Sequence, residues 1–196
     1  MPPLPAERRR WILAGLAFLA LIGWGAVRRT EVLAAVEAGQ VENASPQLGG
    51  DAAGYYRVAI ERPFPCWSPV REPMLPILGR LTLAVFGDPG AGTWEAAPDE
   101  AGRARVLANH AVLRRLSMAL SLLALAAMMG LAFVAFGRAA ALVAGFLHAD
   151  STWLSWYGIA FLREDLVAAL VCVLAAAGLV LQRLDASRTR ERRIAV

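Results

Sequence analysis

Four long apolar stretches, separated by polar segments, dominate the pattern of this chain. They run from Trp11 to Val27, Leu116 to Phe136, Ala139 to Ile159 and Leu166 to Leu181. A helix needs roughly 17 to 25 mostly apolar residues to cross a membrane, and each stretch is close to or within that range. The second stretch fits best because it runs for about 21 residues without a charge. The third is interrupted by His148 and Asp150. The pattern predicts four transmembrane helices, with the third the least regular.

A long segment of mixed polarity, from Thr30 to about Arg105, separates the first predicted span from the second. Within it, Glu31 to Gly39 is typical of a short helix that ends at a glycine. Ile77 to Phe86 is typical of an amphipathic helix whose apolar positions share one face: Leu78, Leu81 and Val85. Such a helix beside a span commonly lies in the membrane interface. We therefore expect an all-α, polytopic transmembrane helix bundle with amphipathic interfacial helices in a long first external loop.

Composition supports a membrane protein. The 196-residue chain is 58% hydrophobic and 18% charged, and its mean hydropathy of +0.49 is high for a soluble domain. The net charge of +4 comes mainly from arginines beside the apolar stretches: Arg8 to Arg10, Arg28 and Arg29, and Arg188 to Arg193. Because these arginines flank spans and lack interleaved aromatic residues, they favour membrane lipid over nucleic acid as the partner.

The arginines also predict the topology. Cytoplasmic segments next to spans are enriched in basic residues, which places the amino terminus inside and the long loop outside. The chain then divides into residues 1–28 with a cytoplasmic tail and the first span, 29–105 as the external loop, 106–183 with three further spans, and 184–196 as a basic cytoplasmic tail. Its richness in arginine and alanine indicates a high-GC bacterium, and so a multi-pass protein of the bacterial inner membrane.

Three motifs in this order carry a family resemblance: "DAAGYYRVA" after the first span, "SPVREPMLPILGRLTLAVFGD" in the loop, and "FGRAAALVAGFLHADSTWLSWYGIAFLREDL" over the third stretch. Together they resemble the amino-terminal portion of the GT-C glycosyltransferases, polytopic enzymes that include protein O-mannosyltransferases and aminoarabinose transferases. The resemblance covers about residues 8–183. It implies transfer of a sugar from a polyprenyl-phosphate carrier to an acceptor at the extracytoplasmic face.

The resemblance places a catalytic carboxylate at Asp51. In the family, the aspartate of the first loop acts as general base and takes the proton of the acceptor hydroxyl. Many relatives carry a second acid directly after it, where this chain has Ala52. Tyr55, with Tyr56 beside it, is suited to provide an apolar wall and a hydrogen bond for that carboxylate.

A phosphorylated carrier also needs positive charge. Arg71 and Arg163 are the residues that we expect near it, because a guanidinium binds phosphate through a fork of donors and stays ionised. Glu72 and Glu164 adjoin these arginines and complete the expected substrate-binding set. Glu164 with Asp165 could orient Arg163 or hold a divalent cation, since oxygen ligands suit magnesium and manganese.

Simpler interpretations remain open for each motif. Asp51 in "GGDAAG" is also typical of a turn, and Arg71 with Glu72 of a local ion pair. Glu164 could simply stabilise the amino end of the last helix, where acidic residues are favoured. His148 and Asp150 suit the interfacial end of a span better than a metal site. The alternative function is a non-catalytic small membrane protein with a GT-C-like fold, which serves as a subunit or binds the lipid carrier. Glycosyltransferase activity is expected if the chain is complete or is complemented by a second membrane subunit.

Overall fold

The computed structural model describes residues 5–41, 47–66, 73–161 and 164–194. These residues form helices and no strands, which confirms the all-α prediction. The elements are α1 (Ala6–Glu37), α2 (Gly50–Glu61), α3 (Met74–Phe86), the 3-10 turn η1 (Pro89–Ala91), α4 (Glu100–Phe136), α5 (Arg138–Asp150), α6 (Thr152–Tyr157) and α7 (Glu164–Ile194).

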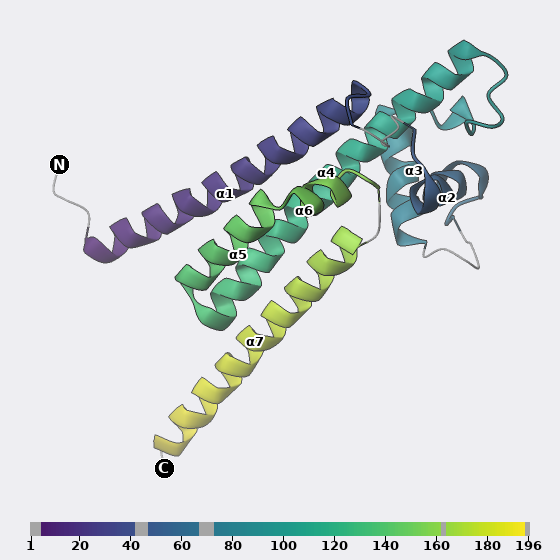
Figure 1. Cartoon of the computed structure of the whole chain (residues 1–196). Coiled ribbons are helices and arrows are strands. Elements are labelled where there is room, and N and C mark those ends of the chain that lie inside the picture. The colour runs from purple at the N-terminus through teal and green to yellow at the C-terminus, as the bar shows by residue number, and fades with distance from the viewer. Residues whose placement is uncertain (1–4, 42–46, 67–72, 162–163, 195–196) are drawn as a thin grey trace.

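The long helix α4 is the centre of the molecule and contacts α1, α3, α5 and α7 (Figure 1). Helices α2 and α3 and the turn η1 gather where α1 ends and α4 begins, which we call the loop end. The amino terminus of α1, the junction of α4 with α5 and the carboxyl end of α7 lie at the other end, which we call the arginine end (Figure 1). The two ends are therefore separated by the length of the long helices.

Three helices in the described parts of the chain are long and apolar enough to cross a membrane: α1, α4 and residues Glu164–Ala186 of α7. The third predicted span, residues 139–159, is instead two shorter helices, α5 and α6. Helix α5 ends at Asp150, and the Ser151 hydroxyl accepts a hydrogen bond from the Leu154 N–H at 3.3 Å as α6 begins. At 1.5 Å per residue, α5 extends only about 20 Å, short of a hydrocarbon core of about 30 Å.

Helix α5 turns back along α4 through a single residue. Gly137 ends α4 and precedes Arg138, and its φ of 91° lies in the left-handed region where a side chain would be strained. A glycine is what allows two helices to meet at so short a turn. Helices α4 and α5 therefore form an antiparallel pair, and α5 also packs against α1.

Several predicted boundaries differ from the observed ones. The short helix predicted from Glu31 is the last part of α1, which continues to Glu37 before Gly39 turns with a φ of 65°. The loop is shorter than predicted, because Asp99 caps α4 and accepts a hydrogen bond from the Gly102 N–H at 2.7 Å. The predicted basic tail is largely helical, since α7 continues to Ile194.

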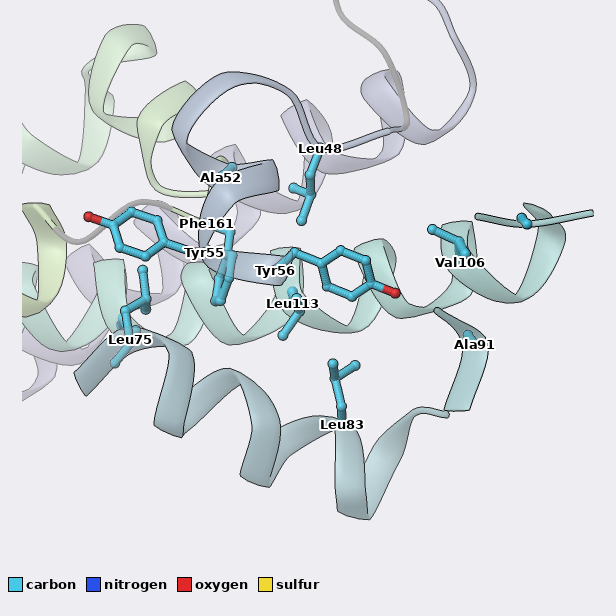
Figure 2. Packing of buried hydrophobic residues seen from close by; sticks show 12 residues of the cluster. Leu48, Ala52, Tyr55, Tyr56, Leu75, Leu83, Ala91, Val106, Leu113 and Phe161 are labelled. Atoms are coloured by element: carbon cyan, nitrogen blue, oxygen red, sulfur yellow. The ribbon is translucent and has the colours of Figure 1, made fainter. Parts of the chain in front are cut away.

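The largest hydrophobic cluster lies at the loop end and joins α2 and α3 to α4 (Figure 2). From α3 it takes Leu75 and Leu83, and Gly79 lets Phe161 approach, since a Cβ there would lie 3.0 Å from that ring. Two residues of the predicted apolar face, Leu81 and Val85, are 54% and 71% exposed and do not belong to this cluster. Helix α3 thus has apolar residues on its packed and its exposed sides, and its place in a membrane interface stays a prediction.

Candidate functional site

Asp51 lies in the first turn of α2, at the loop end of the molecule, and its residue is exposed. A carboxylate is favoured there because the amino end of a helix carries a partial positive charge. The opposite side of α2 is buried and includes Ala52, Tyr55 and Tyr56. Asp51 is therefore an exposed acid on a helix whose other side is firmly packed.

The two tyrosines fix α2 in different ways. Their rings point in opposite directions from the helix (Figure 2). Tyr55 belongs to the hydrophobic cluster with Leu75 and Phe161 and is only 3% exposed. Tyr55, which was predicted to form an apolar wall beside Asp51, thus packs α2 against the hydrophobic cluster.

Tyr56 is the centre of a hydrogen-bonded group. Its hydroxyl donates to the Gly92 carbonyl at 2.8 Å and accepts from the Asn109 amide at 3.2 Å. The same amide group of Asn109 holds the backbone of Asp88, donating to its carbonyl at 2.7 Å and accepting from its N–H at 2.9 Å. Burial raises the pKa of the Tyr56 phenol, the hydrogen bond from Asn109 opposes the rise, and the charge of Asp88 adds to it.

A small hollow lies beside α2, between Tyr56, Trp94 and His110. Its volume of about 20 Å³ is room for about one water molecule. Arg57 and Glu95 also line it and form an exposed ion pair at 3.5 Å. The hollow is too small for a sugar, so a sugar at Asp51 would bind outside it.

Three of the predicted site residues, Arg71, Glu72 and Arg163, lie outside the described residues. Glu164 is the first residue of α7 and is exposed. The described parts of the chain contain no group of three His, Cys, Asp or Glu side chains that could hold a metal ion. The grouping of Asp51 with the two arginines thus remains a prediction.

A buried arginine that the predicted site does not include joins four helices. Arg29 of α1 is 0% exposed and donates to the Ser121 hydroxyl at 2.9 Å, the Gly25 carbonyl at 3.1 Å and His148 Nδ1 at 3.2 Å. Because arginine can only donate, this Nδ1 carries no proton. Asp165 of α7 attracts the guanidinium and interacts with the Ser121 hydroxyl. We call these four side chains the Arg29 network: Arg29, Ser121, His148 and Asp165.

Buried polar side chains recur along one side of α4. We call them the α4 polar stripe: Asn109, His110, Arg114, Ser117 and Ser121. Each contacts a neighbouring segment. His110 Nδ1 accepts from the Leu48 N–H at 3.1 Å, and Arg114 donates to the carbonyls of Gln47 at 3.3 Å and Ile159 at 3.2 Å.

Ser117 completes the stripe by accepting from the Phe161 N–H at 3.1 Å. The stripe therefore supplies hydrogen-bond partners to backbone groups in the segments before α2, before η1 and after α6. These segments lie outside the helices, so their backbone groups lack regular helical hydrogen bonds. The signal was present in the sequence as the pair Asn109 and His110, followed by polar residues at steps of four, three and four along the same helix.

Comparisons with protein-family models, curated proteins and solved structures found no match to this chain. The functional assignment consequently depends on the motifs and on the geometry of the loop end.

Proposed function

We propose that this chain is a membrane glycosyltransferase of the GT-C type, or the amino-terminal part of one. It would transfer a sugar from a polyprenyl-phosphate carrier to an acceptor at the extracytoplasmic face of a bacterial inner membrane. The supporting observation is the place of Asp51: an exposed carboxylate on a packed helix, at the end of the bundle opposite the arginine-rich amino terminus.

In the proposed reaction, Asp51 takes the proton of the acceptor hydroxyl while that oxygen bonds to the anomeric carbon. The bond from the anomeric carbon to the carrier phosphate breaks, and the phosphate leaves with the electron pair. Arg71 and Arg163 would stabilise the charge on the leaving phosphate. Tyr55 and Tyr56 contribute indirectly, because they hold α2 against α4 and so limit the movement of Asp51.

The orientation in this proposal comes from charge. Arg8 to Arg10 and Arg138 lie at the arginine end, which the positive-inside rule assigns to the cytoplasm. The loop end is then extracytoplasmic, as the carrier-linked sugar requires.

The direct test uses membranes that contain the chain, supplied with a panel of radiolabelled polyprenyl-phosphate sugars, one of which carries a photoreactive group. We expect crosslinking of the donor and release of free polyprenyl phosphate. Asp51→Asn should abolish release while crosslinking persists, because the neutral amide cannot accept the proton. The matched control is Glu61→Gln, an exposed acid at the other end of α2. Unchanged release with Asp51→Asn would exclude Asp51 as the base.

A second candidate is the non-catalytic membrane protein, which acts as a subunit or as a carrier-binding partner. It is favoured by the large apolar surface of the outer helices, which includes the exposed Leu13 and Leu19 of α1 and Leu170 and Leu174 of α7. Gly15, Gly23 and Gly178 have open space around them and would allow another helix to approach closely. Donor crosslinking without release by the wild-type chain, with a polytopic protein co-purifying in mild detergent, would favour this candidate.

A further inference from the structure

A pocket at the arginine end lies between α1, α4 and α5, far from Asp51. Its volume is about 230 Å³, and its walls are apolar apart from one arginine, Arg138. Side chains or backbone of Trp11, Gly15, Phe18, Phe133 and Leu142 line it. We call it the Trp11 pocket. Small-molecule sites are commonly about 300 to 1,000 Å³, so this pocket suits part of a larger apolar ligand.

Aromatic rings and a cation form the mouth of the pocket. The rings of Trp11 and Phe133 meet edge to face, with centroids 5.9 Å apart. The Arg138 guanidinium lies 3.8 Å from the centroid of the Trp11 ring, a cation–π contact that holds the charge at the apolar wall. In the described parts of the chain, no carboxylate forms an ion pair with Arg138. Its positive charge is thus available to an anion from outside.

Further positive charge surrounds this mouth. Residues three or four apart are neighbours on a helix, so Arg8 lies on the same face of α1 as Trp11, Gly15 and Phe18, one turn closer to the amino terminus. Arg9 and Arg10 are exposed beside it. Helix α5 also begins at Arg138, and no side chain caps its first N–H groups, which adds partial positive charge.

We propose that the Trp11 pocket binds an anionic phospholipid of the adjoining leaflet, with part of an acyl chain in the pocket and its phosphate at Arg138 and Arg8. The apolar wall continues into surface that faces lipid tails, since Leu13 and Leu16 next to it on α1 are exposed. Tryptophan and arginine are typical of the depth where tails meet headgroups, and basic pockets between membrane helices bind anionic headgroups. The pocket offers an incoming polar ligand no other side chain to orient it. This proposal does not depend on glycosyl transfer.

Two glycines of α1 provide a matched pair for the test. A Cβ at Gly15 or at Gly23 would meet nothing within 4 Å, so a side chain can begin at either position without a clash at its first atom. Only Gly15 lines the pocket. Gly15→Leu therefore fills the space for the acyl chain, and Gly23→Leu controls for added bulk on the same helix. Arg138→Gln removes the charge at the mouth.

The experiment measures lipid retention by native mass spectrometry of the full chain, after incubation with equimolar phosphatidylglycerol and phosphatidylcholine. We expect preferential retention of phosphatidylglycerol by the wild type and by Gly23→Leu, and loss of about tenfold with Gly15→Leu. Arg138→Gln should lower the preference about fivefold, as expected for one basic residue near an anionic surface. Circular dichroism checks that each variant is folded. If Gly15→Leu is unfolded, the lipid preference of Arg138→Gln alone decides the test.

Two results would overturn the proposal. One is equal retention of the two lipids by the wild type. The other is equal retention of phosphatidylglycerol by folded Gly15→Leu and Gly23→Leu. Inorganic phosphate distinguishes a lipid from a free anion: millimolar phosphate that displaces bound phosphatidylglycerol completely would show that the acyl chain contributes nothing.

Discussion

The two ends of this molecule are held together by different forces. From the loop end to the middle of α4, buried polar groups of the α4 polar stripe and the Arg29 network hydrogen-bond to neighbouring segments. At the arginine end, α1, α4 and α5 meet through apolar and aromatic contacts around a pocket, and Arg138 contacts the face of an indole ring. In lipid, apolar contacts discriminate poorly between packing partners, because lipid tails are as apolar as leucine. The polar groups thus specify one arrangement at the loop end, while the arginine end keeps space for lipid.

The largest effect is expected at Arg29, in the middle of the bundle, where the buried polar contacts join four helices. Arg29→Leu removes three hydrogen bonds and leaves Asp165 beside Ser121 without its cation, so the free energy of unfolding should fall by about 3 kcal/mol. Arg28 is the control, since its guanidinium pairs with Glu31 at 2.8 Å with the carboxylate side chain 57% exposed. Arg28→Leu should cost less than about 1 kcal/mol. SDS-induced unfolding in mixed micelles measures both, and equal losses would contradict the clamping role of Arg29.

A smaller effect is expected at Tyr56 of α2, whose hydroxyl accepts a hydrogen bond from Asn109 of the α4 polar stripe. Tyr56→Phe removes its bonds to Gly92 and Asn109 and should cost about 1 kcal/mol. The pH dependence gives an independent check. Because the pKa of Tyr56 is raised in the folded state, the unfolded chain loses this proton first as pH rises. The contribution of Tyr56 to stability is complete below about pH 10 and declines above it. Unfolding curves at pH 8 and pH 11 should show a smaller alkaline loss in Tyr56→Phe than in the wild type; an identical loss would exclude Tyr56 as its source.

The smallest effect is expected for an exposed ion pair at the loop end. Arg57 and Glu95 pair at 3.5 Å with side chains 56% and 66% exposed. A double-mutant cycle with Arg57→Ala and Glu95→Ala should give a coupling energy below about 0.5 kcal/mol, decreasing further in 0.5 M salt. A coupling above about 1 kcal/mol would mean that exposed charges, and not only buried ones, stabilise the loop end.

Much of the helical framework could be predicted from local properties. Length and apolar composition identified three of the long helices, because a span is specified by residues next to one another in the chain. The break at Ser151 was not predicted, since "HADST" is equally compatible with the end of a span. The contact between α3 and Phe161 was not predicted either, because apolar residues occur on several sides of that helix and its periodicity does not show which side meets the ring.

The candidate site was only partly predictable for a similar reason. Asp51 and Tyr55 were identified through a resemblance, and the structure places one on the surface of α2 and the other in the core. Arg28 and Arg29 look equivalent in the sequence and had been interpreted only as topology signals. Neighbouring positions on a helix point about 100° apart, and only the packed structure shows which guanidinium reaches Ser121 and His148.

Helix α4 forms a wall at both ends, with Asn109 in the polar stripe and Phe133 at the Trp11 pocket. At 1.5 Å per residue these positions are about 36 Å apart, slightly more than the hydrocarbon thickness of a typical bilayer. A helix that is longer than the bilayer core is accommodated by tilting, by kinking or by local thickening of the bilayer, and tilting moves the whole bundle. Any tilt then changes the depth of Asp51 and of the Trp11 pocket together, which couples both to bilayer thickness.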